Sequence, residues 1–205
     1  MRQLVGAACG LWAALAPPVL AEPVVVVELF TSQGCASCPP ADEFLEALVK
    51  DPRVIPLSLH VDYWDYIGWE DSFADPKFTA RQKAYARANG SRMIYTPQMI
   101  VDGEERVEGY APDELAVHLG EHLAQPAQVV LSVQRKGDVL VIRAEADPPL
   151  TAPVRVQLVR YRPEETVEIQ RGENAGKVIT YRNIVTRWDN LGDWPGTAPL
   201  ELSAP

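Results

Sequence analysis

The sequence has 205 residues with 19 basic and 28 acidic side chains, which gives a formal net charge of −9. This acidic balance argues against nucleic acid and anionic membrane surfaces as partners. After the N-terminal segment no stretch approaches the roughly 20 apolar residues of a membrane-spanning helix. The length exceeds the usual single domain of about 100 to 150 residues, so two structural units are expected.

Residues 1–21 are predicted to be a signal peptide. Arg2 precedes an apolar stretch over residues 4–16, and small residues suited to cleavage follow before Glu22. Cys9 lies in this segment, so the mature chain keeps two cysteines, with 18 basic and 28 acidic residues and a net charge of −10. The sequence therefore predicts a soluble, exported protein, periplasmic or secreted. In such an oxidising compartment two neighbouring thiols form a disulfide unless a partner reduces them.

A Cys-x-x-Cys motif follows an apolar run and opens a helix. Residues 24–30 are mostly β-branched, which is typical of a central strand covered on both faces, and residues 41–50 have a helical pattern. Unpaired N–H groups and the helix dipole stabilise a thiolate at a helix start. We therefore expect Cys35 to be the nucleophile, with its side chain toward solvent. Cys38 would then resolve the mixed disulfide.

Three functions remain open for this motif. The first is a thiol:disulfide oxidoreductase that acts on protein or peptide thiols with a redox partner and needs no cofactor beyond the Cys35–Cys38 disulfide. The second is a copper(I)-handling module in which His60 joins the two thiolates. The third is a binding module in which the disulfide only staples the loop. Glu28, on the preceding strand, either relays protons to the thiols or reaches solvent at the strand edge.

An aromatic loop over residues 60–69 follows the second predicted strand, residues 54–61. Loops at the carboxyl ends of neighbouring parallel strands meet at one edge of a sheet, so this loop should overhang Cys35. Its side chains either form the wall that a substrate meets or pack as a cap over the sheet edge. The residues concerned are Asp62, Tyr63, Trp64 and Trp69.

The next segments complete an α/β unit that ends near residue 125. A helix is predicted over residues 75–89, and a short strand at 98–101 leads through an Asp102-Gly103 turn into a return strand at 106–108. The last helix, residues 111–124, contains an H-x-x-E-H pattern at His118 to His122. Its apolar stripe puts both histidines beside the buried face, so no metal site is predicted.

From Gln128 the pattern changes to alternation with a period of two. Strands are predicted at 129–133, 139–146 and 154–161, and paired strands continue over 168–187 around a glycine-bearing tip at 171–177. This tip lacks the spacing of a phosphate-binding loop. Residues 126–205 are thus expected to form a small β-rich domain.

Several motifs together resemble the secreted bacterial thioredoxin-like family that is known only as a domain of unknown function. The resemblance covers nearly all of the mature chain. It is carried by residues 27–35, Cys38-Pro39-Pro40, residues 60–69, Thr96-Pro97-Gln98 and residues 171–176.

The resemblance implies a thioredoxin-like domain over residues 22–125, with a central mixed sheet and flanking helices. It further implies that Cys35 and Cys38 are the redox pair and that a cis Thr96–Pro97 bond faces them, offering backbone hydrogen bonds to an extended substrate. The β-rich domain of the relatives would have one strand more than the chain up to Pro205 provides. The chain departs from ordinary thioredoxins in having no tryptophan before Cys35 and in the position of Glu28, one residue farther from the nucleophile.

Overall fold

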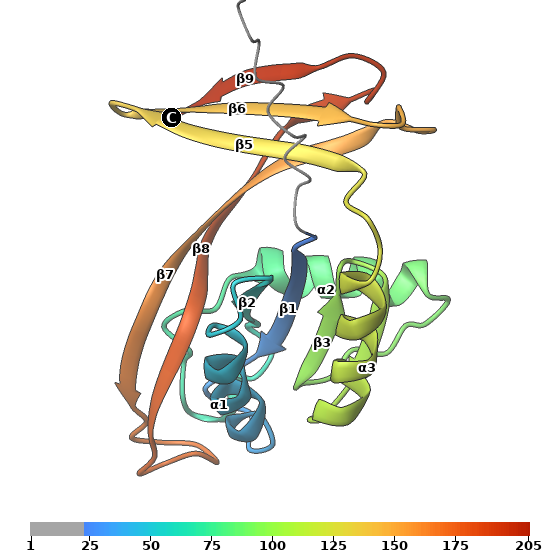
Figure 1. Cartoon of the computed structure of the whole chain (residues 1–205). Coiled ribbons are helices and arrows are strands. Elements are labelled where there is room, and N and C mark those ends of the chain that lie inside the picture. Colours follow the sequence, from blue (N-terminus) through green and yellow to red (C-terminus); the bar gives the residue numbers. More distant parts are fainter. Residues whose placement is uncertain (1–22) are drawn as a thin grey trace, which may run out of the picture.

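The computed structural model describes residues 23–205 (Figure 1). The predicted signal peptide and Cys9 lie outside the described residues. In chain order the elements are β1 (Val25–Thr31), α1 (Pro39–Leu48), β2 (Val54–His60), the short 3-10 helix η1 (Asp65–Ile67), α2 (Pro76–Ala88), β3 (Gln98–Val101), β4 (Glu105–Glu108), α3 (Pro112–Leu123), β5 (Val129–Lys136), β6 (Val139–Ala146), β7 (Val154–Glu168), β8 (Val178–Trp194) and β9 (Leu200–Ala204). The chain is a mixed α/β protein, as the sequence predicts.

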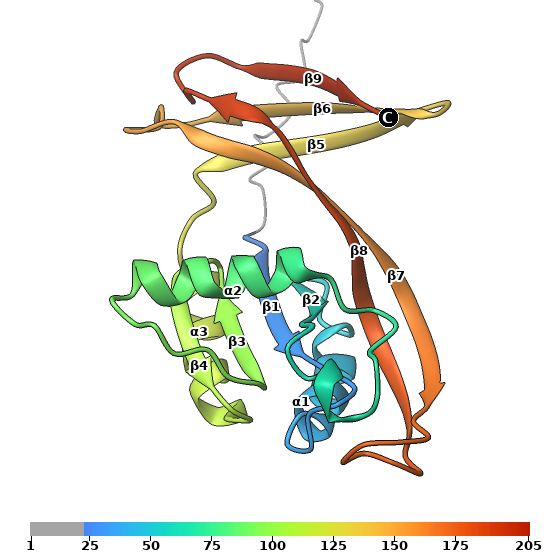
Figure 2. The same ribbon diagram turned by 180° about the vertical axis from the view of Figure 1, so that it is seen from behind.

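Six strands form one mixed sheet in the order β4-β3-β1-β2-β8-β7. Strand β1 pairs in parallel with β2 and antiparallel with β3, and β8 joins β2 in parallel. Helices α1 and α3 pack on one face of this sheet and α2 packs on the other (Figures 1 and 2). Strand β1 is therefore central and covered on both faces, which explains its continuous apolar sequence.

The alternation of side chains along β1 decides what each residue faces. Val27 and Leu29 belong to the core cluster shared with α1 and α3, whereas Phe30 belongs to the cluster shared with α2. Because successive side chains of a strand point to opposite faces, Glu28 points toward α2 and Thr31 toward α1. Thr31, and not Glu28, therefore lies on the face of the sheet that α1 and its cysteines cover.

Residues 126–205 contribute to both sheets of the molecule. Strands β5, β6 and β9 form a separate three-stranded sheet, but the β7–β8 hairpin (residues 154–194, the arm below) extends the six-stranded sheet. The link is a parallel pairing of Ser58 on β2 with Ile184 on β8. Strands of 15 and 17 residues are long enough to reach from one sheet to the other (Figure 1). This region is therefore not confined to a separate β-rich unit.

Local signals in the sequence account for several boundaries. Helix α1 begins two residues earlier than predicted, with Pro39 and Pro40 in its first turn, where a missing N–H costs no hydrogen bond. The β3–β4 turn has positive φ at Asp102 (49°) and Gly103 (80°), as the Asp-Gly pattern predicts. Pro163 lies in β7, an edge strand of the sheet, where proline is tolerated.

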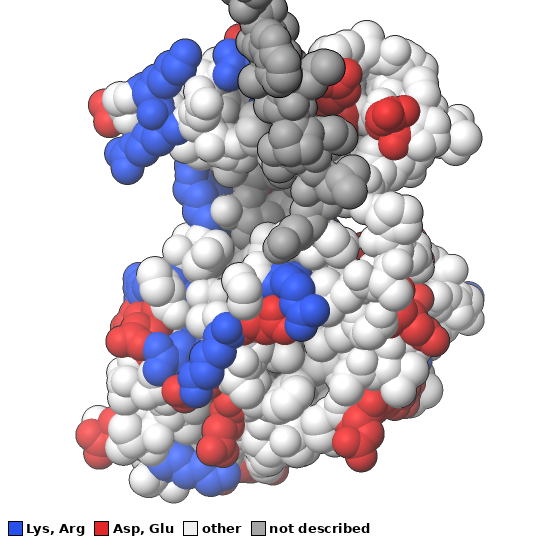
Figure 3. All heavy atoms as spheres, in the orientation of Figure 1, with Lys and Arg blue, Asp and Glu red and all other residues white. Residues whose placement is uncertain are grey.

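The surface of the described residues carries charges of both signs. In the view of Figure 3, basic and acidic side chains are interspersed over the six-stranded sheet and its helices. Among the described residues no helix is long and apolar enough to cross a membrane.

Candidate functional site

A disulfide joins Cys35 and Cys38 at the start of α1, with a Cα–Cα distance of 5.4 Å. Cys38 is the N-cap residue of the helix, and Cys35 lies in the turn before it. Both side chains are buried, with 1% of Cys35 and 0% of Cys38 exposed, whereas Ala36 and Ser37 between them are exposed. The expectation that Cys35 points toward solvent is therefore wrong. The loop after β2 and the segment before β3 contact its neighbours Gly34 and Ser37.

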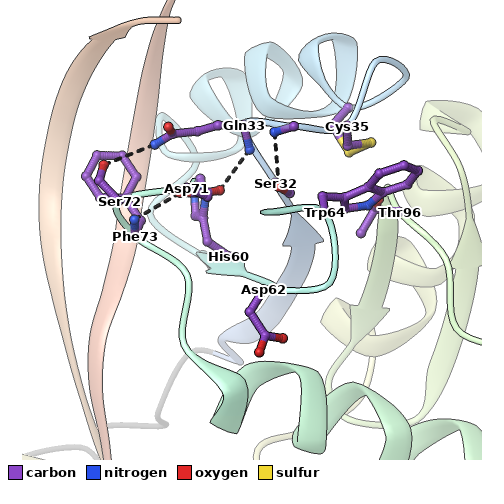
Figure 4. Close-up of polar contacts among 12 residues, drawn as sticks. Ser32, Gln33, Cys35, His60, Asp62, Trp64, Asp71, Ser72, Phe73 and Thr96 are labelled. Carbon is purple, nitrogen blue, oxygen red and sulfur yellow. Dashed lines mark hydrogen bonds and ion pairs between the residues drawn. A yellow bond between two sulfur atoms is a disulfide. The ribbon is translucent and has the colours of Figure 1, made fainter. Parts of the chain in front are cut away.

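The aromatic loop lies against the cysteine turn, as Figure 4 shows. A Cβ placed on Gly34 would lie 3.1 Å from Trp64 Cβ, so the two segments are in close contact. The Trp64 indole N–H donates to Thr96 Oγ1 over 2.7 Å. Trp64 thus packs against Gly34, next to Cys35, and is anchored to the segment before β3.

The Thr96–Pro97 peptide bond is cis. Ser37 Oγ donates to the Thr96 carbonyl over 3.3 Å and also lies 3.5 Å from Cys35 Sγ. The turn between the cysteines and the cis-proline segment are therefore direct neighbours. These contacts bring together Cys35, Cys38, Trp64, Thr96 and Pro97 from three separate parts of the sequence.

Asp71, which the sequence analysis did not single out, fixes the other side of the cysteine loop. Its carboxylate accepts from the backbone N–H of Gln33 over 2.8 Å and of Phe73 over 2.9 Å, and it lies 2.7 Å from Nδ1 of His60 (Figure 4). Burial opposes ionisation, but His60 and these N–H donors hold the pKa of Asp71 below its usual value. The loop before Cys35 is thus anchored to a buried pair.

His60 and Asp62 do not reach the sulfur atoms in a ligand arrangement. His60 is completely buried and paired with Asp71, while the Asp62 carboxylate accepts from Thr79 on α2 over 2.5 Å. Figure 4 places Asp62 on the side of α2, away from the disulfide. In the described part of the chain, the residues whose ligand atoms cluster within 4.8 Å for a metal ion are Glu104, Glu105 and His122, not Cys35, Cys38 and His60.

Glu28 is buried on the opposite face of the sheet from α1. Its carboxylate accepts two hydrogen bonds of 2.6 Å from the Arg81 guanidinium and one of 2.7 Å from the Tyr85 hydroxyl. Arg81 in turn lies 3.8 Å from the ring centre of Trp188. The two alternatives weighed for Glu28 thus give way to a third, an ion pair between the sheet and α2.

Asp42 is the carboxyl group on the same side as the cysteines, and the sequence analysis overlooked it. It lies four residues after Cys38 and is buried between α1 and the sheet. Burial raises the pKa of Asp42 to about 7, against the opposing effect of His60 and of the nearby Thr31 hydroxyl. An acidic residue one turn after Cys38, beside the apolar positions Ala41 and Leu45, was the available signal.

Several buried polar groups near Asp42 lack a hydrogen-bond partner among residues 23–205. Both carboxylate oxygens of Asp42 are in this state. The other groups lie around His60. This residue pairs in register with Thr31, its ring centre lies 4.9 Å from that of Tyr181, and Ser58 is two residues before it on β2. The further atoms without a partner in this region are Thr31 Oγ1, Ser58 Oγ, His60 Nε2 and Tyr181 Oη. Polar groups of this kind are suited to bind water or to exchange protons.

Asn174, at the tip of the arm, lies in the motif of residues 171–176, and the sequence analysis assigned it no role of its own. Its side-chain amide donates to the carbonyl oxygens of Gln33 over 2.9 Å and of Cys35 over 2.8 Å. The sequence predicts a hairpin tip here, and a tip carries no local signal of where it docks. The arm therefore takes part in the site although 139 residues separate Asn174 from Cys35.

The fold and the site define a mixed α/β protein with a disulfide-bonded Cys-x-x-Cys motif at the start of a helix. Residues 26–205 match the family described as "Protein of unknown function (DUF1223)", and the chain belongs to this family. No curated protein matches the chain.

Two solved structures are similar to the chain. A crystal structure of a protein from Agrobacterium tumefaciens is 37% identical, with a TM-score of 0.76 over 90% of this chain and 80% of that one. HBP35 of Porphyromonas gingivalis is 16% identical, with a TM-score of 0.60 over 89% of this chain and 63% of that one. The second likeness is one of fold alone, and the chain spans less than two thirds of that protein.

Proposed function

We propose that the protein is a thiol:disulfide oxidoreductase with a thioredoxin-like redox centre, exported to an oxidising compartment, where it acts on protein or peptide thiols. The observation that carries this proposal is the position of the disulfide: it lies at the N-terminus of α1, directly beside the cis Thr96–Pro97 segment. A helix start stabilises the thiolate that the exchange requires. The chemistry needs only the Cys35–Cys38 pair and no further cofactor.

The exchange has two steps. A substrate thiolate attacks Cys35 Sγ, a substrate–Cys35 disulfide forms, and the Cys35–Cys38 bond breaks with Cys38 leaving as a thiolate. Attack by a second substrate thiolate on the substrate sulfur then releases an oxidised substrate and a Cys35 thiolate. In the reducing direction the same steps run backward, with Cys38 resolving the mixed disulfide. Two electrons pass between the substrate dithiol and the protein disulfide.

Asp42 is the group that supports proton exchange with Cys38. Residues four apart on a helix lie on the same face, so the carboxyl is one turn from the Cys38 side chain. With a pKa of about 7 and no hydrogen-bond partner for either oxygen in the described structure, it can hold or release a proton near neutral pH. The Cys38 thiolate formed in the first step would take its proton from this side.

The burial of the disulfide bears on the choice of substrate. Trp64 packs beside Cys35, and the exposed part of the turn is Ala36 and Ser37. A partner must therefore approach along this turn and the Thr96–Pro97 segment, which suits an extended peptide better than a rigid surface. The aromatic loop would then contribute to the recognition of the partner.

A second candidate function is a binding module in which the disulfide is only structural. The observation that favours it is the almost complete burial of both sulfur atoms, which is also found in inert disulfides. The copper(I) hypothesis has less support, because His60 is paired with Asp71.

The experiment that tests the proposal uses a cyclic peptide closed by one disulfide. The Cys38→Ser variant is expected to accumulate a mixed disulfide with this peptide, seen as a mass increase that thiol reductant reverses. The Cys35→Ser variant is the matched control and should accumulate far less, because its remaining thiol is the resolving one. Equal labelling of both variants, or reaction no faster than that of free cysteine, would contradict the proposal and favour the binding module.

A further inference from the structure

The tip of the arm docks on the loop that carries Cys35. Figure 1 shows the lower end of the β7–β8 hairpin beside α1, far from the three-stranded sheet at its other end. Gly172 contributes to this docking, since a Cβ placed there would lie 3.4 Å from Trp69 Cβ. Its φ of +78° is a conformation that glycine adopts without strain. The tip thus contacts both the aromatic loop and the cysteine loop.

The tip is held in one conformation by its own backbone. The N–H of Gly176 donates to the carbonyl of Ile169 over 2.7 Å, and the N–H of Ile169 donates to the carbonyl of Lys177 over 2.9 Å. Ile169 is completely buried. A tip closed by these bonds and anchored by a buried side chain can place a side chain accurately against another loop.

Both the nitrogen and the oxygen of the Asn174 side-chain amide have hydrogen-bond partners. Its nitrogen donates to the carbonyls of Gln33 and Cys35, and its oxygen accepts from Nζ of Lys177 over 2.7 Å. Only 1% of the residue is exposed, so water does not substitute readily for these partners. The carbonyl of Cys35 also accepts from the N–H of Cys38 over 3.3 Å, across the turn that the disulfide spans.

We propose that Asn174 is a positioning residue that stabilises the Cys35–Cys38 disulfide relative to the dithiol. Through this residue the arm influences the reduction potential of the cysteine pair. The inference rests on the proposed function for its biological meaning. The equilibrium that it describes exists in the protein whether or not the protein turns over a substrate.

The direction of the effect follows from what reduction does to the turn. Reduction breaks the bond between the two sulfur atoms and adds a proton to each, so the sulfur atoms must separate; we infer that the Cys35 segment, which is buried and packed, shifts with its side chain. The Asn174 amide is satisfied in the oxidised geometry, and movement of the Cys35 carbonyl lengthens one of its two hydrogen bonds to the loop. A residue shifts an equilibrium only by its difference in interaction between the two states, and here this difference favours the disulfide.

Asn183 offers a matched control within the same arm. It is also a buried asparagine, and its amide donates to the Pro56 carbonyl over 2.8 Å, which likewise links the arm to the six-stranded sheet. It contacts β2 rather than the cysteine loop. Loss of either side chain removes hydrogen bonds between the arm and an earlier part of the chain, but only Asn174 touches the residue that carries the reacting sulfur.

The test measures the thiol–disulfide equilibrium of the oxidised protein with glutathione, by alkylation and mass spectrometry, for the wild type and the Asn174→Ala, Asn174→Asp and Asn183→Ala variants. For both Asn174 variants the equilibrium constant for disulfide formation is expected to fall at least threefold, a rise of about 14 mV in reduction potential at about 30 mV per factor of ten. The Asn183→Ala variant should stay within 1.5-fold of the wild type. The aspartate variant keeps the shape of the side chain, loses its N–H donors and places a carboxyl oxygen against the two carbonyl oxygens, so its shift should be at least as large as that of Asn174→Ala.

Two results would overturn the proposal. Either the Asn174 variants keep the wild-type equilibrium while they lose stability toward urea, or Asn183→Ala shifts the equilibrium as much as they do. The first result would make Asn174 merely structural, and the second would attribute the shift to general loosening of the arm. A very reducing wild-type potential would count against the oxidoreductase proposal alone, because the shift between variants is measured on the same scale in either case.

Discussion

The substitution Asp42→Asn should make the protein more stable at alkaline pH and should leave its stability at acidic pH almost unchanged. In the folded protein burial raises the pKa of Asp42 to about 7, from an ordinary value of 3.8. Between these two values the folded carboxyl keeps a proton that the unfolded chain has released. Rising pH therefore favours the unfolded state until the folded carboxyl also ionises.

The magnitude follows from the distance between the two pKa values. At about 1.4 kcal/mol per pH unit, a difference of about 3 pH units corresponds to a penalty of about 4 kcal/mol. The penalty is absent below pH 3.8, grows from there to about pH 7, and is constant above that value. Asparagine has a similar shape and no charge, so it removes the penalty without leaving a cavity.

The assay is urea unfolding of the disulfide-bonded protein, followed by tryptophan fluorescence at several pH values between 4 and 9. The free energy of unfolding of the variant relative to the wild type should rise with pH and reach a plateau above pH 7. Asp138→Asn is the matched control, because Asp138 is fully exposed in the β5–β6 turn and its replacement should have no such effect. A difference between Asp42→Asn and wild type that does not change with pH would refute the account of Asp42 as a buried carboxyl with a raised pKa.

Further predictions concern the two faces of the sheet and the aromatic loop. Glu28→Gln should cost about 2 kcal/mol of stability, because Arg81 loses its charged partner, and should not change the pH profile of thiol exchange; a changed profile would restore the relay hypothesis. Trp64→Ala should slow exchange with a folded protein disulfide more than exchange with a small disulfide. The two activation free energies should differ by up to a few kcal/mol, and equal losses would make Trp64 a core residue only. Gly34→Ala should cost about 1–3 kcal/mol in urea unfolding, since its Cβ would lie 3.1 Å from Trp64 Cβ and 3.3 Å from Ile67 Cδ1, and an unchanged stability would mean that the loop yields freely.

Local features of the fold were predictable because their physical causes are local. The β-branched run of β1 and the Asp-Gly turn between β3 and β4 each act within a few residues, and both occur where the sequence predicts them. Helix α1 is also present, and its start differs from the prediction only by the two prolines. The aromatic loop was also placed correctly beside the cysteine turn, since consecutive parallel strands end at the same edge of a sheet.

The features that the sequence left undetermined depend on contacts between distant segments. The pairing of Ser58 with Ile184 brings the arm into the first sheet, and no periodicity in either strand specifies that partner. Asn174 is a hairpin-tip residue whose role depends on the docking of the tip. Cys35 is likewise buried in a site to which the loop after β2, the segment before β3 and the tip of the arm contribute contacts, and all three are distant from it in the sequence.

Glu28 and Asp42 show that the direction of a side chain, which follows from the periodicity of its strand or helix, decides which buried carboxyl lies on the side of the cysteines. Glu28 precedes the cysteines on a buried strand, but its even position in β1 turns it toward α2 and Arg81. Asp42 lies on the helix instead, one turn after Cys38. Attention to the faces of both elements, in addition to the presence of a buried carboxyl, would have favoured Asp42.

The reduction potential of the Cys35–Cys38 pair tests the central claim most directly. It is measured by equilibrating the protein in a series of thiol–disulfide buffers, trapping free thiols with a maleimide and counting them by mass. An exchange catalyst is expected to have a potential between about −270 and −120 mV, the range of known thiol–disulfide exchange proteins. A potential below about −300 mV, typical of structural disulfides, would contradict the oxidoreductase account.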